Sequence, residues 1–215
     1  MTADAWGAEV RRRLGLGRLL PLGEAADGVW VTERAAGAVL CAAAGAVPGL
    51  ALTAVRLSLA APDASGPPAA WAPPSAPGAG PVRVSAEVAV WGAEPLPGRL
   101  ERLREVLWEA ADARVGLALT GVDVHVTALL SAPAQLPPRT PPAGRPPDTP
   151  LARAALSVPG VASLTAELGH PLSPRPDRPD VLELTTAAGH RALDVARAVR
   201  GVVGGGVGVL VTWVG

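Results

Sequence analysis

Clustered proline is the feature that most restricts how this chain can fold. Of the 24 prolines in its 215 residues, 19 lie in the ranges 61–81, 131–150 and 171–179. Proline fixes φ and has no N–H group, so such segments cannot form a helix interior or a central strand. We therefore expect long loops at 61–81 and 171–179, and a linker between two domains at 131–150.

The sequence before the linker changes its hydrophobic period in a regular way. Thr32 can cap a helix that runs to about Ala46, and Pro48-Gly49 ends it. Alternating apolar residues predict strands at 52–59 and 82–90. After Pro97 the period becomes that of a helix, with Gly116 as its stop. The apolar stripe and the closing strand are carried by Leu100, Leu103, Leu107 and Ala110, and then by Val122, Val124 and Val126.

The same order returns after the linker. Thr149-Pro150 begins a short helix to Val158, and the ranges 161–168, 181–186, 190–200 and 207–214 read as strand, strand, helix and strand. Val47-Pro48-Gly49-Leu50 also parallels Val158-Pro159-Gly160-Val161. We therefore expect an α+β fold made of two related α-β-β-α-β two-layer sandwich units that arose by internal duplication. A short strand at 29–31 can precede the first unit. The expected divisions are 1–27, 28–130, 131–150 and 151–215.

Composition restricts both the core and the partners of the protein. The chain is 49% hydrophobic but lacks Phe and Tyr, so its core must be built from Ala, Val and Leu. All 19 basic residues are Arg, a bias typical of GC-rich genomes such as those of actinobacteria. The net charge of zero argues against nucleic acid as a partner, because binding to phosphate normally requires a basic excess.

The N-terminal residues do not have the order of a signal peptide. Their charges follow the first apolar residues, and no apolar run in the chain is long enough to cross a bilayer. We expect a cytoplasmic protein that contacts membrane only peripherally. Arg11-Arg12-Arg13, with Trp6, Val10 and Leu14, predicts a short amphipathic helix. Docking of this helix onto the first unit is favoured over binding to a membrane surface.

Residues able to do chemistry are few and scattered. The single cysteine, Cys41, lies in an apolar run and is expected to be a small buried hydrophobic residue. Asp123 with His125, and His190 with Asp194, have the spacing of carboxylate–imidazole pairs, but neither has a nucleophile nearby. The third histidine, His170, has no such neighbour. We interpret both pairs as solvated polar faces and predict no catalytic, cofactor-binding or metal-binding residues.

Two further patterns have simple structural explanations. The glycines between Gly201 and Gly208 follow a helix and precede a strand, whereas phosphate-binding loops follow a strand and precede a helix. We expect Gly201 to stop the helix. A row of Glu101, Glu105 and Glu109 and a set of Arg191, Arg197 and Arg200 lie on corresponding helices. They could attract one another across an interface, but we interpret them first as solvated faces.

One stretch of the chain is similar to a known family. The residues that carry the resemblance are Gly28–Ala35, Ala44–Leu50, Val82–Val90, Leu100–Ala113 and Gly121–Val126. In this order they resemble the alkaline shock (Gls-type general stress) protein family of Gram-positive bacteria. The resemblance covers 28–130, and the residues after 150 are similar to a degenerate second copy. The proline-rich insertion 61–81 and the absence of a clear opening strand in the second unit depart from the family pattern.

The resemblance implies a cytoplasmic protein that acts in stress or at the cell envelope, without known catalysis. Some members of the family are held at the membrane by a partner protein. We therefore expect a non-catalytic interaction or scaffold protein with a protein partner, such as a small membrane-anchored protein; a homo-oligomer is also compatible with the sequence. The alternative is a small-ligand-binding or enzymatic protein with a pocket between the two units, formed by Asp123, His125 or Trp213.

Overall fold

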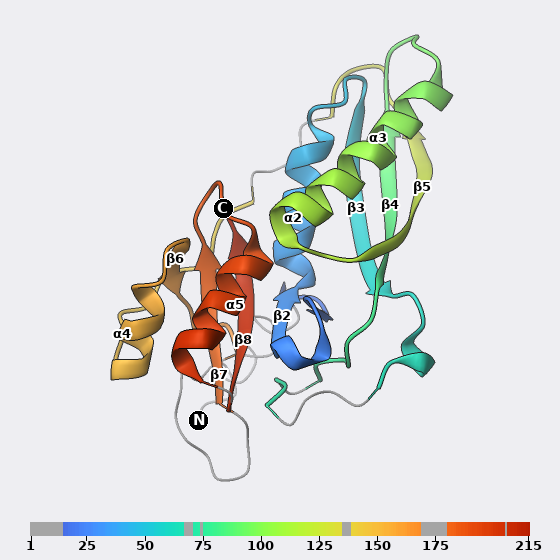
Figure 1. Ribbon diagram of the computed structural model, residues 1–215. Coiled ribbons are helices and arrows are strands. Elements are labelled where there is room, and N and C mark those ends of the chain that lie inside the picture. The colour runs from blue at the N-terminus through green and yellow to red at the C-terminus, as the bar shows by residue number, and fades with distance from the viewer. Residues whose placement is uncertain (1–14, 67–70, 74, 135–138, 169–179, 205) are drawn as a thin grey trace, which may run out of the picture.

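The computed structural model of the protein describes residues 15–66, 71–73, 75–134, 139–168, 180–204 and 206–215 (Figure 1). The amphipathic helix expected at the N-terminus, His170 and the proline-rich range 171–179 lie outside the described residues. Helices and strands share the chain, so the α+β class is confirmed. Eight strands form the two sheets: β1 Leu19–Pro21, β2 Val29–Thr32, β3 Leu50–Leu59, β4 Val82–Val90, β5 Leu119–Leu129, β6 Val161–Leu164, β7 Asp180–Thr186 and β8 Val207–Val214.

The described helices alternate with these strands. They are α2 Glu33–Ala44, α3 Leu96–Ala110, α4 Pro150–Leu156 and α5 Ala192–Val203. Short turns of other helix types lie at Ala25–Asp27, Pro62–Ala64 and Ala111–Val115. One sheet has the strand order β1-β2-β8-β7-β6 and the other has the order β3-β4-β5.

Both halves of the chain use one pairing scheme. β3 and β4 are antiparallel and β4 and β5 parallel, with α3 as the crossover. β6 and β7 are likewise antiparallel and β7 and β8 parallel, with α5 as the crossover. The predicted order helix, strand, strand, helix, strand therefore occurs twice. Descent from an internal duplication stays a prediction.

The extra strand expected at 29–31 forms, but it does not join the sheet of the first unit. It is β2, and it pairs in parallel with β8, Val29 opposite Val209 and Val31 opposite Val211. β1 pairs antiparallel with the other edge of β2. The assignment of 28–130 to one unit therefore needs correction, because the residues before α2 belong to the sheet of the second half. The physical reason is that β8 would otherwise have an exposed apolar edge, and β2 covers it.

Helix α2 is shared by the two sheets (Figure 1). Thr32 caps it as predicted, since its Oγ1 accepts the N–H of Ala35 at 3.1 Å. Its small side chains allow close packing: a Cβ on Gly37 would lie 2.9 Å from Val55 of β3. On the other side α2 contacts β8. Residues of both sheets and of all four helices therefore form one continuous apolar core.

Helix α3 has the predicted apolar stripe and one buried residue that the pattern does not predict. Leu103, Leu107 and Ala110 are buried, and Gly116 ends the helical segment with φ of 91°. Arg99 is also buried, at 9% exposure. Its guanidinium donates to three backbone oxygens: Gly49 at 2.8 Å, Trp91 at 2.9 Å and Glu94 at 2.7 Å. Arg99 thus holds the start of α3 against the turn that precedes β3.

The end of α5 differs from the prediction. The helix continues through Gly201 to Val203 and ends at Gly204, whose φ is 88°. Glycine inside a helix costs only about 1 kcal/mol, and burial of Val203 at 8% exposure favours the extra turn. Helix α4 has its predicted N-terminal cap, since Oγ1 of Thr149 accepts the N–H of Ala152 at 3.0 Å.

Part of the first proline-rich segment is a packing element. Trp71 and Ala76 lie against Trp30 and Leu210, on the face of the five-stranded sheet that the helices do not cover. The indole Nε1 of Trp30 donates to the oxygen of Pro77 at 3.2 Å. Trp71 also packs closely on the residue before β2, because a Cβ on Gly28 would overlap its Nε1. The segment therefore covers the part of this face that β2 and β8 form.

Candidate functional site

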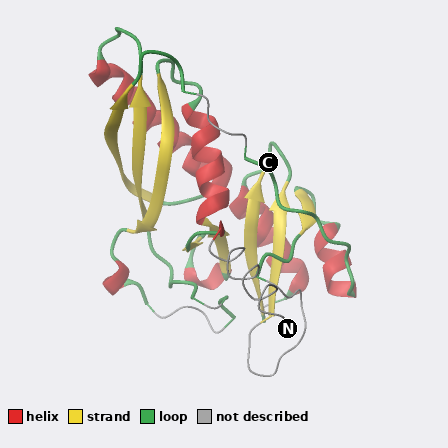
Figure 2. Ribbon diagram, turned by 180° about the vertical axis from the view of Figure 1, so that it is seen from behind, coloured by secondary structure: helices red, strands yellow, loops and turns green. Residues whose placement is uncertain are grey.

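The three-stranded sheet has one covered and one uncovered face. Helices α2 and α3 pack on one face, while no described helix or strand lies across the other (Figure 2). The register brings polar side chains from all three strands together there, because Arg56, Ser85 and Asp123 are mutually opposite. We call this surface the open face and define it by Arg56, Ser58, Arg83, Ser85, Glu87, Asp123 and His125.

Asp123 and His125 are both on the open face, as their spacing predicts. Asp123, however, pairs with Arg83, whose Nη1 lies 2.8 Å from Oδ2 of the aspartate. The two side chains are 51% and 45% exposed, so the pair contributes little to stability. His125 is exposed and lies opposite Glu87 in the register. The two residues are therefore neighbours on a solvated face and do not form a carboxylate–imidazole pair.

His190 and Asp194, the other residues with this spacing, are both exposed, as their interpretation as a solvated polar face predicts. Nδ1 of His190 lies 3.3 Å from the oxygen of Ala188, and Oδ1 of Asp194 lies 3.4 Å from Nη1 of Arg191. The imidazole instead packs next to a glycine turn, since a Cβ on Gly160 would lie 2.7 Å from its Cδ2. His190 is thus part of the packing between the start of α5 and the turn before β6.

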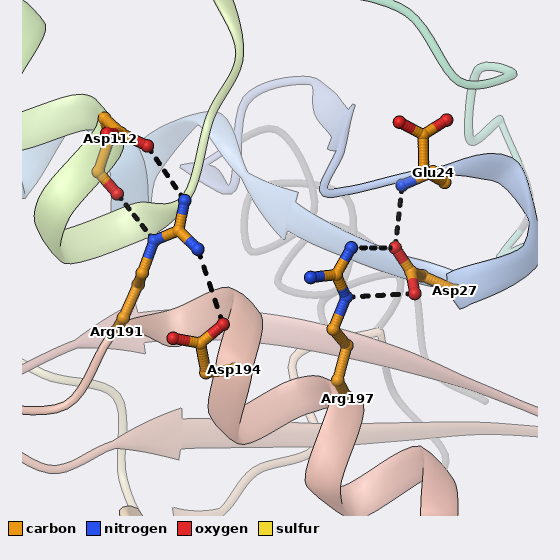
Figure 3. A network of polar contacts seen from close by, with 6 residues as sticks. All are labelled: Glu24, Asp27, Asp112, Arg191, Asp194 and Arg197. Atoms are coloured by element: carbon orange, nitrogen blue, oxygen red, sulfur yellow. Dashed lines mark hydrogen bonds and ion pairs between the residues drawn. The ribbon is translucent and has the colours of Figure 1, made fainter.

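Arg191, just before α5, and Arg197 and Arg200 within it lie at the surface, as predicted, but each also contacts a distant segment, which was not predicted. Arg191 reaches the end of the α3 segment: its Nη2 and Nε lie 2.8 Å from Oδ1 and from the backbone oxygen of Asp112 (Figure 3). Arg197 holds both carboxylate oxygens of Asp27, at 3.0 and 2.7 Å. Arg200 donates to the backbone oxygen of Asp27 at 2.9 Å and stacks on Trp71, 5.1 Å from the ring centre.

These contacts have an electrostatic consequence at Asp27. The hydrogen bonds from Arg197 hold the pKa of the Asp27 carboxyl below its usual value, and the N–H of Glu24, 2.7 Å away, acts in the same direction. The same pair raises the pKa of Arg197. The arrangement joins α5 to the turn before β2, and we interpret it as a link within the fold.

The acidic row of α3 behaves as a solvated face, as predicted. Glu101 and Glu105 pair with Arg104 and Arg102 of their own helix at 2.8 and 3.1 Å. Glu109 is exposed. Arg191 pairs with Asp112 and Asp194, and Arg197 pairs with Asp27, so the attraction considered between the two rows is not formed in the described residues.

Two buried glutamates were not anticipated from the sequence. Glu33, 9% exposed, accepts the N–H of Arg18 at 3.1 Å and the N–H of Leu57 at 2.9 Å. Glu183, 2% exposed, accepts the N–H groups of Glu167 and Leu168. The donors to Glu33 come from two separate segments and those to Glu183 from two consecutive residues after β6, so both carboxylates have a structural role. β6 ends at Leu164, before the residues that bind Glu183, and is shorter than the predicted range 161–168.

Cys41 is half-buried and packs against the core, in agreement with its interpretation as a small hydrophobic residue. Burial raises the pKa of its thiol, although the neighbouring Arg139 acts in the opposite direction. Arg139 is far away in the sequence, so no local pattern could have placed it beside the cysteine.

The residues proposed to form a pocket between the halves do not come together. Asp123 and His125 lie on β5 of one sheet, whereas Trp213 lies on β8 of the other. A small cavity of about 10 Å³ lies at the edge of β6 and β7, beside Arg145, Asp148 and Glu183. It has room for about one water molecule. Within the described ranges no three His, Cys, Asp or Glu residues gather as a metal site would require.

Hydropathy adds one further observation. In the part of the chain that the structure describes, no helix combines the length and the apolar character needed to cross a bilayer.

Comparison with known proteins gives no relative. The chain matches no protein-family model, no curated protein and no solved structure.

Proposed function

We propose that this protein is a non-catalytic interaction or scaffold protein that binds a protein partner through the open face of its three-stranded sheet, in general stress or at the cell envelope. The observation that carries the proposal is the open face itself. It lies on strands of 9 to 11 residues, presents charges of both signs, and has no described element across it.

The rigidity of the sheet supports this role. Val84, Ala86 and Val88 of the central strand are fully buried on the helix side, at 0% exposure. The polar side chains opposite them are therefore held on a fixed backbone, which reduces the entropy lost when a partner binds. Charges of both signs also favour a protein surface over a polyanion, because complementary charges provide specificity between proteins.

The association with stress and the envelope comes from the resemblance of 28–130 to the alkaline shock family. A small membrane-anchored protein is the partner we expect, and it would hold this chain at the inner face of the membrane. Mixed charge on the open face would then be matched by a polar segment of the partner.

Affinity capture from the native host tests the proposal. The full chain carries a tag, and bound envelope proteins are measured by mass spectrometry with and without envelope stress. Arg56→Glu changes an exposed charge on the open face, and Arg153→Glu makes the same change on the exposed side of α4. We expect Arg56→Glu to lower recovery of the partner at least tenfold, while Arg153→Glu leaves it unchanged.

Two results would count against the proposal. One is recovery of the same envelope proteins by both variants. The other is a small metabolite that raises the melting temperature of the purified chain by several degrees, because ligand binding stabilises the folded state. That second result would favour the ligand-binding alternative.

A further inference from the structure

Strand β5 is a long sheet edge without a described neighbour. It runs from Leu119 to Leu129 and pairs only with β4 (Figure 1). The other edges are shorter or protected: β1 has 3 residues, β6 pairs with Arg145, and the carboxylate of Glu33 takes the N–H of Leu57 in β3. Free edges of this length promote pairing with another strand unless they carry proline, lysine or a cover. The described residues of β5 carry no proline, no lysine and no cover, and the two irregularities in its register with β4 lie near its ends, outside the regular stretch 121–126.

The backbone of β5 presents regularly spaced hydrogen-bonding groups at this edge. Val82 donates to the oxygen of Ala118, and Leu130 donates to the oxygen of Val90, so the even residues of β4 point toward β5. Val84, Ala86 and Val88 stand opposite Val122, Val124 and Val126. In a parallel ladder, a residue that points toward its neighbour bonds to the two residues on either side of the one opposite it. The backbone N–H and C=O groups of Asp123 and His125 therefore point toward β4. The N–H and C=O groups of Val122, Val124 and Val126 are left for the free edge.

We propose that two copies of this chain pair antiparallel along β5, about a twofold axis at Val124. In this register Val124 meets Val124 of the second copy, and Val122 meets Val126. These are the residues whose backbone groups point outward, so the axis coincides with a hydrogen-bonded pair. Six hydrogen bonds can form across the axis, two for each of the three valine pairs, as an estimate from the ladder geometry of about two bonds per such pair.

The side chains of β5 are complementary to themselves in the same register. On the open face Asp123 stands opposite His125 of the second copy, and the pair occurs twice because of the twofold axis. On the helix face Val122 stands opposite Val126, and further out Leu119 stands opposite Leu129. An aspartate that can accept a hydrogen bond from a histidine, and branched apolar residues opposite each other, are both favourable cross-strand pairs. A shift of one residue would oppose Asp123 to Val124 and remove both kinds of match.

Exposure along β5 fits this occupant. Val122 is 9% exposed, but Val126 is 39% and Leu129 79% exposed. Apolar exposure therefore rises toward one end of the strand, and the antiparallel arrangement places that end beside the better-covered end of the second copy. Pairing would join two three-stranded sheets into one of six strands and make the two open faces continuous. The inference is independent of the partner proposed above, since Arg56 lies on β3, at the opposite edge.

The register is tested with two single variants and their mixture. His125→Asp opposes aspartate to aspartate twice, and Asp123→Arg opposes arginine to histidine twice. In a 1:1 mixture, Asp123 of the first variant meets His125 of the second, and the new Asp meets the new Arg. We expect a dimer for the wild type, at least tenfold weaker dimerisation for each variant alone, and recovery in the mixture. Sedimentation equilibrium measures all four, and Asp63→Arg, an exposed site outside the sheets, is the control.

Amide exchange provides an independent measurement. In concentrated wild-type solution, the N–H groups of Val122, Val124 and Val126 should exchange at least tenfold more slowly than in dilute solution, while those of Asp123 and His125 stay constant. A wild type that is still monomeric at about 100 µM would overturn the proposal. So would a dimer that both variants leave intact, because the interface would then lie elsewhere. Neither result would affect capture of a partner through Arg56.

Discussion

Replacing Glu33 by glutamine tests whether a buried carboxylate joins the two sheets. Glu33 is the first residue of α2, and its two oxygens accept N–H groups that come from different places: Arg18, just before β1, and Leu57, in β3. A glutamine retains one acceptor oxygen and places an NH₂ group where the second one was. One backbone donor then loses its partner and faces another donor.

The expected loss follows from these two contacts. A hydrogen bond to a charged group is worth about 1.5–3 kcal/mol, and the negative charge at the helix N-terminus adds about 0.3–1 kcal/mol. We expect Glu33→Gln to destabilise the fold by about 2–4 kcal/mol. In a chain of 215 residues this lowers the melting temperature by about 4–16 °C.

Thermal unfolding followed by circular dichroism provides the measurement. Glu101→Gln is the matched control, because Glu101 is exposed on α3 and pairs only with Arg104 of the same helix in the described contacts. Its melting temperature should stay within about 2 °C of the wild type, as expected for a surface pair. A melting temperature for Glu33→Gln as high as that of the control would refute the reasoning.

Two more predictions concern the links described above. The pKa of Asp27 is lower in the folded than in the unfolded chain, so its contribution to stability is complete above the unfolded value of about 3.9 and is lost as pH falls. Between pH 6 and pH 3, the free energy of unfolding measured in urea should therefore fall less for Asp27→Asn than for the wild type. An equal fall for both proteins would contradict this. Arg99→Ala leaves three backbone oxygens without their donor and should cost about 2–4 kcal/mol in thermal unfolding. Arg153→Ala, on an exposed surface, should change stability by less than about 0.5 kcal/mol.

Local patterns predicted the elements well where a single segment determines its own structure. Strand 82–90 was placed at its true bounds, because one side of β4 faces solvent and its residues alternate. The threonines at 32 and 149 cap their helices through their own hydroxyl groups. Gly116 ends its helical segment through its own positive φ. Each of these features depends on a few consecutive residues.

Features that depend on distant residues were not predicted. The burial of Arg99 requires carbonyl groups at 49, 91 and 94 to converge, and an arginine on a helix is normally solvated. The pairing of β2 with β8 joins positions 29 and 209, and no pattern in either strand names its partner. The arginines of α5 were interpreted as solvated because Asp27 and Asp112 lie far from them in the sequence. Of the candidate site, the sequence indicated the polar faces of β4 and β5 one by one, but not the register that places them side by side.

The position of β8 between β2 and β7 has a consequence for biosynthesis. During translation β2 leaves the ribosome long before β8, so Val29 and Val31 must wait for Val209 and Val211. The segment 33–129, by contrast, contains a complete three-stranded ladder with its two helices and can begin to fold early. Although β1 can pair with one edge of β2 early, the other edge stays unpaired until β8 is made, and an unpaired apolar edge of this kind promotes aggregation of the nascent chain.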